Sequence, residues 1–264
     1  MQLRDDIRRT VGMLRRTALA AFATAAVAGA CLGPAAAQAP APAREARAID
    51  ALTAMGKYLR TLKTFSVSAE TAIDEVLDNG QKVQFGGIVE YRVQSPDRMR
   101  VEVRTDRRTR QFVFDGKTIT QYAPRAGYYA SVPARGTIRE ALVLVDRKYD
   151  VEIPLADLFF WGTDQAGLDD IKEAAYLGPA KIGGRSCDHY AFRQEGVDWQ
   201  VWIQPGKQPL PCKMVITTTS EPSQPQYTSV LKWDLAPKFD AATFRFTPPK
   251  GAHRIEAAPL AAAK

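Results

Sequence analysis

From residue 65 onward, apolar and polar side chains alternate, and turn signals interrupt the alternation at short intervals. Asn79-Gly80 and Pro205-Gly206 are two such signals, because glycine tolerates the positive φ that tight turns need. Successive side chains of a strand point to opposite faces of a sheet. The pattern therefore predicts an antiparallel meander with one apolar and one solvated face.

Helical periodicity replaces the alternation in three places. Residues 44–63 carry one apolar stripe, made of Ile49, Leu52, Met55, Leu59 and Leu62. Residues 137–148 are expected to form a second helix, capped by Thr137 with Glu140 three residues later. Residues 154–161 are expected to form a third, which Pro154 would open. This third segment is so apolar that it must be buried or cover an apolar surface.

The first 37 residues have the order of a secretory signal. A basic stretch ends at Arg16, an apolar run covers residues 18–30, and three alanines precede Gln38. The run is shorter than the roughly 20 residues that span a bilayer, which disfavours a membrane anchor. We therefore predict export to the periplasm with cleavage after Ala37. Residues 28–31 also resemble a lipoprotein processing site, and in that alternative Cys31 would carry a lipid.

The remaining chain is expected to form one domain. Residues 38–43 are a proline-rich tether, residues 44–253 the domain, and residues 254–264 a disordered tail. The formal charge of +7 includes five arginines and two aspartates of the signal segment. The other basic residues alternate with apolar ones on predicted strands, as on a solvated face, so we expect no nucleic-acid partner.

Export bears on the state of the two cysteines that would remain after cleavage. Cys187 and Cys212 are expected to form a disulfide, since the periplasm is oxidising. Such a bridge would stabilise the fold by about 3 kcal/mol. The alternative is a reactive thiol beside His189, two residues away on the same strand face.

Residue patterns typical of catalysis are missing from the sequence. It contains no G-x-S-x-G elbow, phosphate-binding loop, dinucleotide fingerprint or spaced metal-ligand cluster, so we predict no enzyme activity, no cofactor and no metal. The unusual feature is the number of aromatic residues on the predicted strands. Two interpretations stay open: an ordinary core, or a concave sheet face too large for its own side chains, with a cavity for lipid-like ligands.

Four stretches together resemble the LolA/LolB-type periplasmic lipoprotein-carrier superfamily. They are LRTLKTFSVS (59–68), GIVEYRVQSPDRMRVEV (87–103), DGKTITQYAP (115–124) and FDAATFRFTPPKG (239–251). CDHYAF (187–192), DWQVWI (198–203) and PLPC (209–212) resemble a family of predicted periplasmic proteins of unknown function within it. The resemblance implies a mainly β fold with some α structure. Its curved antiparallel sheet would form an incomplete barrel with a helical lid.

In such carriers the apolar cavity holds lipoprotein acyl chains. One position departs from the pattern: carriers have an arginine before the proline of the strand–Pro–strand element, and this chain has Ser95, so no functional residue carries over there. The expected cavity lining is Phe85, Val89, Tyr91, Met99, Val101, Phe112, Phe114, Leu155, Leu158, Phe159 and Trp161.

These features predict a periplasmic, non-enzymatic protein that binds a lipid, acyl chain or lipoprotein, with a carrier role. The alternative is an envelope sensor or assembly protein that binds another envelope protein through the same groove or a sheet edge.

Overall fold

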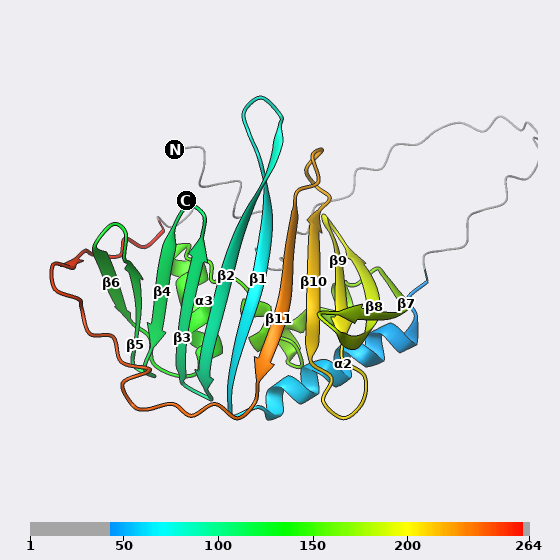
Figure 1. The fold of residues 1–264 in the computed structure, drawn as a ribbon, viewed down its shortest axis with the longest axis horizontal. Helices are drawn as coiled ribbons and strands as arrows, with labels where there is room; N and C mark the ends of the chain where they lie inside the picture. Colours follow the sequence, from blue (N-terminus) through cyan, green and yellow to red (C-terminus); the bar gives the residue numbers. More distant parts are fainter. Residues whose placement is uncertain (1–42, 261–264) are drawn as a thin grey trace, which may run out of the picture.

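The computed structural model describes residues 43–260 of the chain. In that range twelve strands form one sheet, accompanied by two α-helices and three 3-10 helices (Figure 1). The strands are β1 (Thr64–Val76), β2 (Lys82–Gln94), β3 (Arg98–Thr105), β4 (Thr109–Phe114), β5 (Thr118–Ala123), β6 (Tyr128–Pro133), β7 (Glu173–Ile182), β8 (Arg185–Gln194), β9 (Val197–Ile203), β10 (Pro211–Thr218), β11 (Gln226–Asp234) and β12 (His253–Arg254). The helices are α2 (Ala46–Thr61), α3 (Ile138–Tyr149), η1 (Ala156–Phe159), η2 (Asp164–Ala166) and η3 (Leu168–Asp170). The predicted signal segment, Cys31 and nearly all of the tether lie outside the described residues.

The sheet consists of two meanders joined at its centre. Its order is β12-β6-β5-β4-β3-β2-β1-β11-β10-β9-β8-β7, so β1 links the β1–β6 half to the β7–β11 half. All pairs are antiparallel except β12 with β6. Because the two edges do not meet, the sheet stays open (Figure 1). The predicted fold class, a curved antiparallel sheet covered by helices, is confirmed.

The alternation in the sequence determines which face of the sheet is apolar. Phe65, Val67 and Ala69 of β1 are buried, and the residues between them are not. Tyr91 of β2 pairs in register with Val67, and Val101 of β3 pairs with Tyr91, so the same face stays apolar across three strands. The core lies between this face and the helices that cover it.

The two α-helices follow their sequence signals closely. Helix α2 buries Leu52, Met55 and Leu59 of the predicted stripe. Helix α3 begins with the predicted capping box: the Thr137 hydroxyl accepts from the Glu140 backbone N–H, and the Glu140 carboxylate accepts from the Thr137 backbone N–H. None of the helices among the described residues is long and apolar enough to cross a membrane.

The predicted third helix, residues 154–161, is wrong in its conformation. Leu155 lies in the left-handed region at φ 64°, and only Ala156–Phe159 form a short 3-10 helix, followed by η2 and η3. Its apolar side chains follow one another without a polar face, so an α-helix could not bury them all on one side. Residues 154–171 are called the lid segment below.

The C-terminal region departs from the predicted disordered tail. Arg254 belongs to β12, the Ile255 backbone N–H donates to the Tyr129 carbonyl, and the Leu260 backbone N–H donates to the Lys148 carbonyl. Up to residue 260 this segment is therefore tied to the domain.

The predicted disulfide between Cys187 and Cys212 is confirmed, with an S–S distance of 2.09 Å. The bridge packs with Trp202 and Val215 in a second, smaller core. Cys187 therefore offers no free thiol, which removes the alternative of a reactive cysteine beside His189.

Candidate functional site

Ten of the eleven residues predicted to line a cavity meet in one continuous core. Val89, Tyr91, Met99, Val101, Phe112 and Phe114 come from the sheet, and Leu155, Leu158, Phe159 and Trp161 come from the lid segment. Phe85 is the exception, because it lies further along the β1–β2 hairpin, where the Arg107 guanidinium covers its ring at 4.2 Å. That these residues line a ligand cavity remains a prediction.

Aromatic contacts hold the lid segment on the sheet. The Phe159 ring lies 5.7 Å from that of Tyr91 and 6.4 Å from that of Phe65, measured between centroids. Trp161 stacks on Trp199 at 6.4 Å. The Tyr91 hydroxyl donates a hydrogen bond to the Pro154 carbonyl, which fixes the start of the segment.

Arg60, in the last turn of α2, fastens the lid segment to that helix. Its guanidinium donates to the carbonyl oxygens of Leu158 and Phe159. Burial, and then the charge of Arg139, lower the pKa of Arg60 to about 10. The Nε atom of Arg60 is buried without a hydrogen-bond partner among the described residues. The contact of Arg60 with the lid segment was not predicted from the sequence. The only indication there was the position of a cation near the end of a predicted helix.

Two glycines bring α2 and the lid segment into backbone contact. A Cβ on Gly56 would lie 2.4 Å from the backbone N of Gly162 and 2.7 Å from its Cα. Gly162 also has a φ of 79°, which favours glycine. The sequence did not indicate this contact, because the two residues are distant in the chain.

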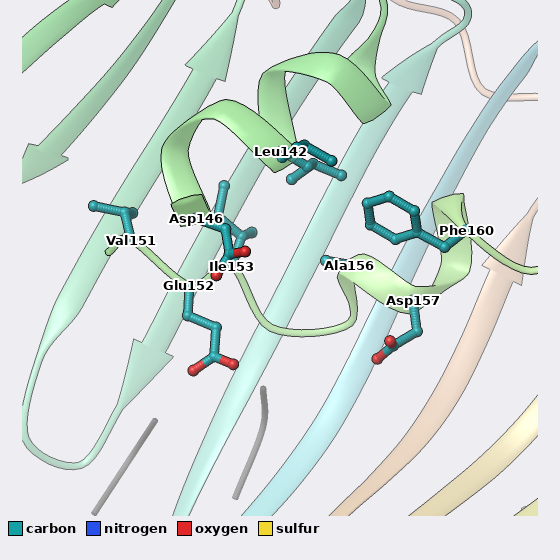
Figure 2. Close-up of a pocket in the computed structure, with 9 residues that line it drawn as sticks. Leu142, Asp146, Val151, Glu152, Ile153, Ala156, Asp157 and Phe160 are labelled. Atoms are coloured by element: carbon teal, nitrogen blue, oxygen red, sulfur yellow. The ribbon is translucent and has the colours of Figure 1, made fainter. Parts of the chain in front are cut away.

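A small hollow of about 30 Å³ lies between the end of α3 and η1 (Figure 2). Its lining is Leu142, Val143, Asp146, Val151, Glu152, Ile153, Ala156, Asp157 and Phe160. In Figure 2, Leu142 and Phe160 point toward each other. The carboxylates of Glu152 and Asp157 lie below them in this view. The hollow is too small for an acyl chain, so a ligand would have to displace part of the lid segment.

Asp157 is the most perturbed acid of this region. Burial raises its pKa from its usual value near 3.8 to about 6. Its charge also raises the pKa of Tyr227, after the larger effect of burial, and that of Tyr91, after burial and the charge of Tyr227. A neutral Asp157 therefore fits the closed lid better than a charged one.

Replacing Asp157 with asparagine is expected to stabilise the protein at pH 7.5 but not at pH 3.5. Because the folded-state pKa lies above the unfolded value, the native protein loses stability as pH rises from about 4 to about 6. After allowance for residual solvent contact, Asp157→Asn should recover about 2 kcal/mol above that range. Urea unfolding at both pH values measures this. An equal effect at both pH values would contradict it.

A second, larger hollow is a groove of about 610 Å³ between the outer face of α3 and η2. Its lining is Thr137, Arg139, Glu140, Val143, Leu144, Arg147, Lys148, Asp164 and Gln165. The residues predicted to line a cavity are absent from this set.

His189 lies on the face of the disulfide and is held by structural contacts. Its ring stacks on Trp202 at 3.9 Å, and its Nε2 atom lies 2.9 Å from the Gln200 amide oxygen. Burial lowers its pKa. Within residues 43–260, no group of three or more His, Cys, Asp or Glu side chains is placed to hold a metal ion.

The chain is similar to known proteins along most of its length. A family model described as "Predicted periplasmic protein (DUF2092)" matches residues 48–258. No curated protein sequence matches.

An uncharacterized conserved protein from Thermus thermophilus is 12% identical with a TM-score of 0.45, over 80% of this chain and 99% of that chain. LprF from Mycobacterium bovis is 16% identical with a TM-score of 0.43, over 81% of this chain and 100% of that chain. Lipoprotein LppX from Mycobacterium tuberculosis is 13% identical with a TM-score of 0.37, over 74% of this chain and 98% of that chain.

Proposed function

Because the chain belongs to the DUF2092 family of predicted periplasmic proteins, we propose that it is a non-enzymatic protein that binds a lipid or acyl chain between its sheet and its lid segment. The family description agrees with the periplasmic location predicted from the sequence.

The observation that carries this proposal is the construction of the lid. An open sheet presents a broad apolar face, and the segment that covers it consists of three short 3-10 helices rather than a long helix. The hydrogen bonds of 3-10 helices have poorer geometry than those of α-helices. The segment is fastened by Arg60, by Tyr91 and by ring contacts, and its release would expose the buried apolar side chains of Leu158, Phe159 and Trp161.

Opening this lid would expose an apolar surface that an acyl chain can replace. Phe159 and Trp161 lie over Tyr91 and Trp199, and an inserted chain would take their place against the sheet. Each buried CH₂ group contributes about 0.8 kcal/mol, so a long acyl chain offsets the loss of the lid contacts. No precise polar contact is needed, which supports a lipid as the ligand.

The alternative, binding of an envelope protein through a sheet edge, has less support. A bulge between Tyr176 and Gly178 interrupts the ladder of edge strand β7, and Pro179 follows it. Bulges and prolines of this kind disfavour the addition of a further strand.

Native mass spectrometry of the protein purified gently from the periplasm tests the proposal. We expect a stoichiometric adduct that solvent extraction identifies as an acyl-containing lipid. The emptied protein should then take up a fluorescent fatty acid. An empty protein that also fails to take up the fatty acid would make the interior an ordinary core and favour the protein-binding alternative.

A further inference from the structure

The groove between α3 and η2 carries an excess of positive charge. Arg139, Arg147 and Lys148 line it, and none of the three has an ion pair or a side-chain hydrogen bond within the described part of the chain. Lys148 only approaches the ring of Tyr149, at 5.6 Å.

Two acids also line this groove and offset part of its charge, and the positive charge of Arg139 contributes to the lowered pKa of Glu140. The Glu140 carboxylate is used in the cap of α3, where it accepts from the Thr137 backbone N–H and hydroxyl. Asp164 begins η2 on the opposite wall. The lining therefore keeps a net positive charge.

Arg60 extends this positive region toward the interior. Its buried Nε has no partner among the described residues, and the positive charge of Arg139 lowers the pKa of Arg60 after the larger effect of burial. No carboxylate forms an ion pair with either of them in residues 43–260. The two like charges repel, and an anion bound at Arg139 would weaken that repulsion.

The groove is also lined by two apolar side chains of α3, and one of them lines the small hollow as well. Val143 and Leu144 lie between the cations, and Val143 also lines the small hollow beneath η1 with Leu142 and Phe160. Cations and aliphatic side chains in one lining match an amphiphile with an anionic head.

We propose that the groove binds the phosphate group of an amphiphile, with Arg139, Arg147 and Lys148 around its oxygens and the acyl chain running past Val143 under the lid segment. This inference rests on the proposed function, because it assigns the head of the ligand whose chain occupies the interior. Arginine suits phosphate because its planar guanidinium donates two parallel hydrogen bonds.

The test compares three probes by isothermal titration of the full chain without its signal segment. The probes are dihexanoyl phosphatidate, uncharged dihexanoylglycerol and inorganic phosphate. We expect the phosphatidate to bind at least about tenfold more tightly than dihexanoylglycerol, and this advantage to fall as salt is raised. The double variant Arg139→Gln/Arg147→Gln should lose the advantage and keep the affinity for dihexanoylglycerol.

A matched control removes the same charge elsewhere. Arg125→Gln/Lys207→Gln changes two exposed cations outside the groove and should leave all affinities unchanged. Equal affinity for phosphatidate and dihexanoylglycerol would overturn the groove inference and leave the proposed function standing. Phosphate alone binding as tightly as phosphatidate would overturn the amphiphile assignment. Failure of both lipids to bind would overturn the proposed function and this inference with it.

Discussion

Replacing Gly56 with valine is expected to lower the free energy of unfolding by about 3 kcal/mol and to loosen the lid segment. A Cβ at residue 56 would lie 2.4 Å from the backbone N of Gly162 and 2.9 Å from the backbone carbonyl carbon of Trp161. These are backbone atoms, which cannot rotate away as a flexible side chain can. Either α2 or the lid segment must therefore move, and hydrogen exchange of residues 156–171 should become faster.

Lys57→Val is the matched control for this substitution. Lys57 is exposed on the same helix, so Lys57→Val introduces the same β-branched side chain without the contact to the lid segment. Helix propensity alone would make Gly56→Val the less destabilising of the two, because valine ranks above glycine and below lysine. Urea unfolding and hydrogen exchange of both variants separate the two causes. Equal losses of stability in the two variants, or unchanged exchange in the lid segment of Gly56→Val, would show that the glycine contact does not hold the lid.

The local rules of the sequence predicted the elements well. The alternation around Phe65 and Val67 identified the buried face of β1, and Thr137 with Glu140 identified the start of α3. The disulfide followed from the compartment and from the number of cysteines. These features depend on neighbours in the chain or on simple chemistry, so a single sequence carries them.

Features that depend on how elements meet could not be predicted in the same way. The contact of Gly56 with Gly162 and the bonds from Arg60 to the lid segment join residues about 100 positions apart. Phe85 was predicted to line the cavity because it follows the same apolar alternation as Val89 and Tyr91. The β1–β2 hairpin, however, carries it away from the main core, under Arg107. The groove on α3 depends on which helix face the tertiary fold leaves exposed.

Replacing Phe159 with aspartate is expected to abolish acyl-chain uptake. The ring of Phe159 lies between those of Phe65 and Tyr91, and its side chain is 5% exposed. A carboxylate there would replace a ring that packs among aromatic side chains, and moving its charge out of water costs several kcal/mol. The charged lid could not close over an acyl chain, so uptake of a fluorescent fatty acid should fall below detection.

Two further variants make this result interpretable. Leu177→Asp introduces the same charge on edge strand β7, where Leu177 is 56% exposed, and should leave uptake unchanged. Phe159→Leu keeps an apolar side chain of similar size and should retain most of the uptake. Near-ultraviolet circular dichroism establishes that each variant is folded before uptake is measured. If folded Phe159→Asp binds the fatty acid as well as the wild-type protein, the lid segment does not cover the ligand, and the acyl chain must bind at another surface of the sheet.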